Sequence, residues 1–175
     1  MLTEFVRDHY FTTAWFGLMA FVWFGWSQED PPKRWRPWLG AGSVLGIGFA
    51  VWFGVLTATN WDQPSALAGR YGWFGVLVAA EVVVAGLGCL LLARRGASRW
   101  LAWWVAVVVA AHFLPLAVLL ADAGVGVAGV VQLAALGAAV PRLRATDTTT
   151  SRVAGPVMGT VLLVSAVTGA VLTVV

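Results

Sequence analysis

Residues 71–99 read YGWFGVLVAAEVVVAGLGCLLLARRGASR, and the architecture of the whole chain can be worked out from this pattern. An apolar run from Tyr71 to Ala93 carries one charge, Glu81, and is followed by three arginines between positions 94 and 99. A helix of about 20 apolar residues is long enough to cross the hydrocarbon core of a bilayer. The stretch therefore predicts a transmembrane helix that ends in a basic loop.

The same pattern recurs along the chain, where six apolar runs are joined by short polar connections. The predicted spans are Tyr10–Trp26, Trp38–Thr57, Tyr71–Ala93, Trp100–Ala121, Ala123–Val140 and Val153–Val175. Of the 175 residues, 60% are hydrophobic and 11% are charged, whereas a soluble domain carries about 25% charged residues. The predicted fold class is all-α: residues 1–175 form a single domain, a polytopic bundle of six transmembrane helices. Pro141 is expected to end the fifth helix.

The basic residues are distributed unequally between the two sides of this bundle. Nine of the eleven lie in three alternate connections: Lys33, Arg34, Arg36, Arg94, Arg95, Arg99, Arg142, Arg144 and Arg152. Because loops rich in Lys and Arg stay in the cytoplasm, this pattern predicts a protein of the cytoplasmic membrane with both termini outside. Anionic lipid headgroups, and not nucleic acid, are the expected partners of the basic loops.

Glycines spaced by four residues mark two predicted helices. Gly42 and Gly46 lie in the second span, and Gly155 and Gly159 lie in the sixth. This spacing lets two helix backbones touch. Packing within the chain is the main interpretation, and a homo-oligomer formed through these glycine-rich faces is the alternative.

The tripeptide Trp-Phe-Gly occurs four times in the first three predicted spans. Its glycines are Gly17, Gly25, Gly54 and Gly75. Two interpretations stay open: the trace of an old repeat of helix pairs, or a bias in composition.

Three polar residues are expected near the middle of three different spans. Glu81 lies ten residues into the third span, His112 twelve residues into the fourth and Gln132 nine residues into the fifth. At about 1.5 Å per residue, the three lie at similar depths. Ionisable residues at this depth are costly and mark functional sites, whereas polar residues also hold helices together by hydrogen bonds. The sequence predicts one shared cluster, and it leaves open whether Glu81 and His112 form an ion pair or a neutral hydrogen-bonded pair.

The segment around His112 carries a resemblance. Residues 111–117 read AHFLPLA, in which Pro115 removes a backbone donor three residues after the histidine. The segment resembles a His-Phe-x-Pro-Leu-Ala element of small, uncharacterised multi-span bacterial membrane proteins. The resemblance covers seven residues and implies a membrane protein, but it brings no activity with it.

A second group of polar residues is expected at the outer ends of the spans. Its members are Asp8, His9, Asn60, Asp62, Arg70 and Asp122. They form either the rim of an outward-facing pocket or ordinary solvated helix ends.

No cofactor or metal site is expected. One cysteine and two histidines leave few ligands for zinc, and the chain contains neither a Gly-rich phosphate loop nor a Gly-x-Ser-x-Gly nucleophile elbow. The only lysine, Lys33, lies in a loop, which argues against a Schiff base within a span.

The leading functional hypothesis is that the protein binds or transports a small solute. Glu81, His112 and Gln132 would line its site, and a buried acid among aromatic residues suits a cationic or protonatable ligand. Two alternatives remain: a membrane-embedded enzyme or accessory protein that uses the same cluster, and a structural subunit of a larger membrane assembly.

Overall fold

The computed structural model describes residues 4–174 and consists of six long helices joined by short connections. The helices are α1 (Val6–Trp26), α2 (Arg36–Thr59), α3 (Tyr71–Arg94), α4 (Leu101–Leu119), α5 (Ala123–Arg144) and α6 (Ser151–Val174). Short 3-10 helices cover Ser27–Glu29 (η1), Lys33–Trp35 (η2) and Ser98–Trp100 (η3). The prediction of an all-helical fold is confirmed. Val175, the last residue of the predicted sixth span, lies outside the described residues.

Five of the six helices are long and apolar enough to cross a membrane. These segments are Lys33–Thr59, Tyr71–Arg94, Ser98–Leu119, Ala123–Arg144 and Ser151–Thr173. Helix α1 is not among them, and its sequence includes Arg7, Asp8 and three tryptophans. Length and composition therefore identify a chain with several helices suited to a bilayer.

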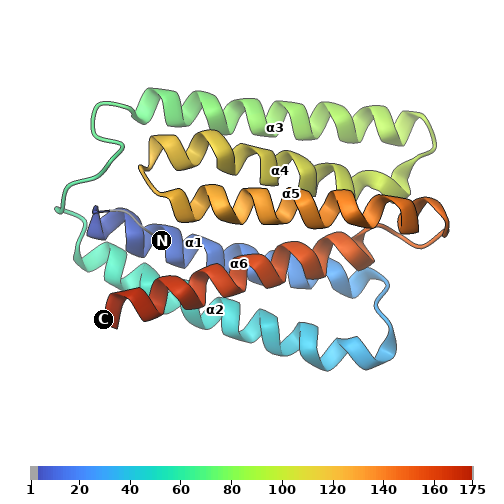
Figure 1. The fold of residues 1–175 in the computed structure, drawn as a ribbon, viewed down its shortest axis with the longest axis horizontal. Helices are drawn as coiled ribbons and strands as arrows, with labels where there is room; N and C mark the ends of the chain where they lie inside the picture. The colour runs from blue at the N-terminus through green and yellow to red at the C-terminus, as the bar shows by residue number, and fades with distance from the viewer. Residues whose placement is uncertain (1–3, 175) are drawn as a thin grey trace.

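The helices lie side by side and alternate in direction (Figure 1). Three connections, around residues 27–35, 95–100 and 145–150, gather at one end of the bundle, which we call the basic end because the nine clustered basic residues lie in or beside them. The two remaining connections and both ends of the described chain lie at the opposite end.

Glycine pairs set how closely α1 packs against its neighbours. A Cβ atom added at Gly42 or Gly159 would lie within 3 Å of the Phe24 ring, and one at Gly155 would lie 2.8 Å from the carbonyl oxygen of Trp23. Gly46 contacts the backbone of α1 directly. The glycines of both predicted pairs thus pack against α1 of the same chain. Gly155 also packs against Ser27, in the turn that follows α1.

Helices α4 and α5 form an antiparallel hairpin. Gly129 of α5 packs closely against α4, since a Cβ there would lie 2.8 Å from the carbonyl oxygen of Ala110. The expectation that Pro141 ends the fifth helix was wrong: α5 continues through Pro141 to Arg144. One missing backbone donor in the last turn is tolerated because the chain there is exposed, and the carbonyl of Pro141 still accepts a hydrogen bond from Ala145.

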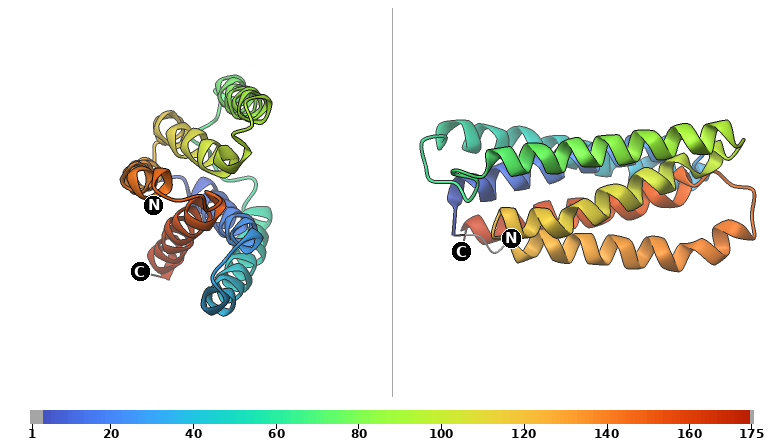
Figure 2. Two further views of the ribbon diagram at one scale, coloured as in Figure 1. Left: turned by 90° about the vertical axis from the view of Figure 1, so that its right-hand side faces the viewer. Right: turned by 90° about the horizontal axis from the view of Figure 1, so that it is seen from above.

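Helix α3 stands apart from the rest of the bundle. It packs mainly against α4 and has no buried residue, although it is the most hydropathic of the five apolar segments. Seen along the bundle, α3 lies at its edge and α4 lies between α3 and α5 (Figure 2). The inward face of α3 is therefore a single stripe, and the remainder of its surface faces away from the chain.

Candidate functional site

Glu81 lies on the one stripe of α3 that faces α4. It is the eleventh of the 24 residues of the helix and belongs to a series of half-buried positions that also includes Leu77, Ala85 and Gly88. The other faces of α3 expose valines and leucines. Alternation of 3 and 4 residues thus places the only charge in the interior of α3 on the face that contacts another helix.

His112 meets Glu81 from α4. It is buried, with Phe113 beside it in an edge-on ring contact at 6.4 Å, and Pro115 follows within the same helix. Nδ1 of His112 lies 2.9 Å from Oε2 of Glu81. The predicted proximity of these two residues is therefore present in the structure.

The pair is close but only partly aligned. The two atoms are within ion-pair distance, but the direction of the ring N–H of His112 does not meet hydrogen-bond geometry. The side chain of His112 is 7% exposed and that of Glu81 is 22% exposed. The carboxylate therefore faces the histidine on one side and keeps an accessible edge on the other, so it can accept a second partner.

Gln132 does not join this pair, which corrects the prediction of one shared cluster. The residue is fully buried in α5, and within residues 4–174 neither its amide nitrogen nor its amide oxygen has a hydrogen-bond partner. Helix α4 separates α5 from α3 (Figure 2). Depth alone does not decide which side of a helix a residue faces.

One of the polar residues predicted at the outer ends, Asp8, holds a connection in place. The Asp8 carboxylate accepts hydrogen bonds from the backbone N–H of Ala66 at 2.6 Å and from the hydroxyl of Ser65 at 3.1 Å, and it is 5% exposed. Its neighbour Arg7 donates to the carbonyl of Trp61 and to the hydroxyl of Tyr71. These contacts tie the start of α1 to the α2–α3 connection.

Four of the five other members of this group have hydrogen-bond partners of their own. The ring Nε2 of His9 lies 2.9 Å from the carbonyl of Gly169 in α6, and the Asp122 carboxylate caps α5 by accepting from Gly124. Asn60 and Arg70 donate to backbone carbonyls four residues earlier, and Asp62 is exposed. The group lies at one end of the bundle as predicted, but its contacts are those of helix ends and connections.

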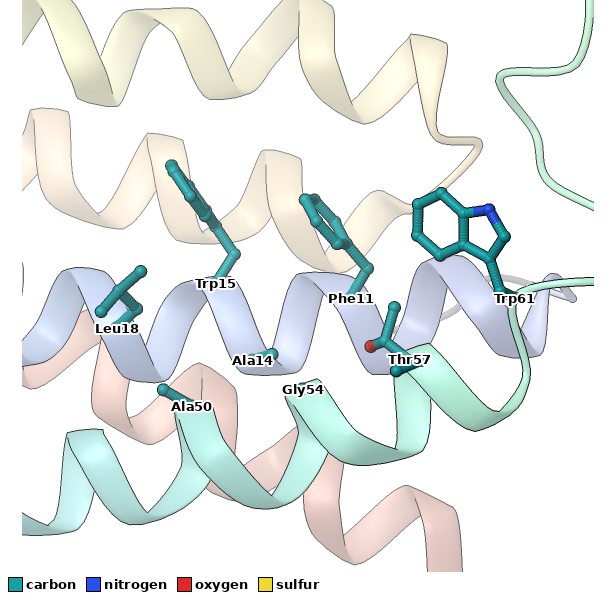
Figure 3. A pocket seen from close by; sticks show the side chains of 9 residues that line it. Phe11, Ala14, Trp15, Leu18, Ala50, Gly54, Thr57 and Trp61 are labelled. Carbon is teal, nitrogen blue, oxygen red and sulfur yellow. The ribbon is translucent and has the colours of Figure 1, made fainter.

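An apolar groove between α1 and α2 was not anticipated from the sequence. Its volume is about 300 Å³, and its lining residues are Phe11, Ala14, Trp15, Leu18, Ala50, Gly54, Thr57, Ala58 and Trp61. The rings of Phe11 and Trp15 stack at 6.2 Å and project from α1 beside Trp61 (Figure 3). The groove exists because the α2 residues that line it are small. Their spacing by four, at Ala50, Gly54 and Ala58, is the sequence pattern that could have predicted it.

Comparison with known proteins gives no relative for this chain. No protein-family model matches it, and no curated protein and no solved structure shows significant similarity to it. Function must therefore be inferred from the geometry of the residues themselves.

Proposed function

We propose that the chain is a six-span protein of the cytoplasmic membrane, with the basic end in the cytoplasm and both termini outside. Five helices have the length and composition for crossing a bilayer. Helix α1 would be the sixth, since it packs against α2 and α6 along the same bundle. The gathering of nine basic residues at one end supports the orientation.

Within this protein, we propose that Glu81 and His112 bind a small cationic solute and exchange it for a proton. The observation that carries the proposal is the 2.9 Å contact between a buried histidine and a carboxylate that keeps an accessible edge, both near the middle of their helices. Placing an ionisable pair at that depth costs free energy, and such residues in membrane spans usually have a function.

The exchange balances in charge and protons. In the resting site, the Glu81–His112 pair would hold one proton and carry no net charge. A cation that binds the carboxylate would supply the same positive charge, so the pair would release that proton. One cation enters the site, one proton leaves it, and the net charge of the site is unchanged. Return of the proton to the pair would displace the cation.

The experiment is a proton-release assay in proteoliposomes that contain a pH-sensitive dye. Guanidinium and tetramethylammonium chlorides serve as probes, because permanently charged ions do not cross protein-free vesicles unaided. We expect one of these probes to drive proton movement in vesicles with the wild-type protein, and we expect Glu81→Gln to remove that movement. Glu29→Gln is the matched control, since Glu29 is exposed in a connection.

Two results would contradict the proposal. If vesicles with the wild-type protein behave like protein-free vesicles for both probes, cation–proton exchange at this site is wrong. If Glu81→Gln behaves like the wild type, Glu81 has no part in the movement.

A structural subunit is the second candidate, and one observation favours it. Helix α3 has no buried residue and packs mainly against α4, so most of its apolar surface is free to meet another membrane protein. In this case the Glu81–His112 pair would hold α3 against α4. Co-purification of a defined partner from the membrane, lost when exposed α3 residues such as Leu87 are changed to tryptophan, would support it.

A further inference from the structure

A second hollow lies at the basic end of the bundle, away from Glu81 and from the α1–α2 groove. Its volume is about 420 Å³, and it is lined by Arg99, Trp100, Trp103, Val140 and Arg144. The first three come from η3 and the start of α4, and the last two from the end of α5. We call this the basic-end hollow.

On the α4 side of the hollow, Thr150 from the connection between α5 and α6 makes two hydrogen bonds to the backbone. The hydroxyl of Thr150 donates to the carbonyl of Arg99 at 2.7 Å and accepts from the backbone N–H of Trp103 at 3.1 Å. The indole N–H of Trp103 in turn donates to the carbonyl of Leu136 in α5 at 3.3 Å. The indole bond joins the two helices that border the hollow, and the Thr150 bonds join the start of α4 to the connection between α5 and α6.

The lining combines two kinds of surface. Val140 and the perpendicular rings of Trp100 and Trp103, 5.8 Å apart, give it an apolar part. Arg99 and Arg144 give it a cationic part. Arg99 also donates to the carbonyl of Thr146 and lies 3.3 Å from a carboxylate oxygen of Asp147, whose side chain is fully exposed to solvent. The balance of charge around the hollow is therefore positive.

We propose that the basic-end hollow binds the headgroup of an anionic phospholipid. Arginine pairs bind phosphate through charge-assisted hydrogen bonds, and tryptophan prefers the headgroup region of a bilayer. The phosphate would lie between Arg99 and Arg144 and replace the solvated Asp147 contact. The glycerol would lie on the two indole rings, and an acyl chain would leave past Val140. This inference does not depend on any role of Glu81.

The test is native mass spectrometry of the intact protein, released from a neutral detergent and titrated with dioleoyl phosphatidylglycerol or dioleoyl phosphatidylcholine. We expect one phosphatidylglycerol to bind in preference to phosphatidylcholine. Because one arginine near a membrane surface is worth about a fivefold change in binding of anionic lipid, Arg144→Gln should weaken phosphatidylglycerol binding by about fivefold. Arg142→Gln is the matched control, since Arg142 lies on the same turn of α5, carries the same charge and does not line the hollow.

A second variant tests the hollow without changing its charge. Val140→Trp places a ring in the space and should abolish selective binding while both arginines remain. Three results would overturn the proposal: equal binding of the two lipids, equal weakening by Arg142→Gln and Arg144→Gln, or unchanged binding in Val140→Trp. Displacement of the lipid by inorganic phosphate at millimolar concentration would also overturn it, because the site would then recognise the free anion.

Discussion

Gly17 of α1 and Gly46 of α2 lie backbone against backbone. A Cβ atom added at Gly46 would lie 2.6 Å from the carbonyl oxygen of Gly17, and one added at Gly17 would lie 2.7 Å from that of Gly46. Real Cβ atoms essentially never come within 3.0 Å of a non-bonded heavy atom outside their own stretch of chain. The crossing of these two helices therefore requires glycine on both sides, and it holds α2 close to α1.

Gly46→Ala should lower the thermal stability of the protein in detergent. The added methyl group meets a backbone oxygen, which cannot move without separating the helices, so we expect a loss of about 1–3 kcal/mol. Melting followed by circular dichroism measures the effect. Gly48→Ala is the control on the same helix, where a Cβ meets open space, and alanine there should be neutral or slightly stabilising. Equal losses in the two variants would show that the crossing is not as tight as described.

Glu81 and His112 should be energetically coupled. A double-mutant cycle with Glu81→Gln and His112→Gln, measured by thermal unfolding, should give an interaction energy of about 0.5–3 kcal/mol, because the residues are in direct contact. The cycle is informative because glutamine keeps the size of the acid and leaves no large cavity. Strictly additive effects would mean that the 2.9 Å contact contributes nothing to the folded state.

The proposed orientation predicts where cysteines react. In a Cys89→Ser background, cysteines at positions 97 and 148 should resist a membrane-impermeant maleimide added to intact cells, because both positions lie at the basic end. A cysteine in place of Asp62, at the opposite end, should react. The reverse pattern would mean that the protein faces the other way, and labelling at both ends would argue against a bundle that spans the membrane.

Asp8→Ala should destabilise the opposite end of the bundle. Removing the buried carboxylate leaves the N–H of Ala66 and the hydroxyl of Ser65 without their acceptor, and an unsatisfied buried group costs about 1–3 kcal/mol. Limited proteolysis should cut the connection between α2 and α3 faster than in the wild type, together with a lower melting temperature. Asp62→Ala, in that same connection but exposed, should change neither. Indistinguishable proteolysis of the two variants would exclude a fastening role for Asp8.

Gln132→Met should leave stability unchanged or raise it. The amide is fully buried and has no hydrogen-bond partner within residues 4–174, and burying such a group without a partner costs about 1–3 kcal/mol. Methionine has nearly the same length and removes that cost. Gln28→Met, at an exposed position, should have little effect. A clear loss of stability in Gln132→Met would mean that the amide has a polar partner in the membrane.

The repeated Trp-Phe-Gly tripeptides illustrate the limit of a pattern read along the chain. Only the first copy places its glycine in a close helix contact, at Gly17. A Cβ at Gly25, Gly54 or Gly75 would meet open space. The four identical tripeptides thus lie in different surroundings. What a glycine contacts depends on the face of the helix that it occupies and not on the residues next to it in sequence.

Sequence patterns alone were enough to predict the six helices, the polar connections between them and the gathering of basic residues in alternate connections. These features depend on local composition and on the rise of a helix, both of which act along the chain. The depth of Glu81, His112 and Gln132 could be counted in the same way.

Which of these residues meet depends on how the helices pack in three dimensions. Glu81 contacts His112, while Gln132 belongs to α5, which α4 separates from α3. Arg99 and Arg144, from different helices, line one hollow. Lateral arrangement is set by the close contacts that side chains and glycines allow between helices, such as Gly17 on Gly46 and Gly129 on Ala110. Such contacts join residues distant in sequence, so hydropathy and residue counts along the chain do not specify them.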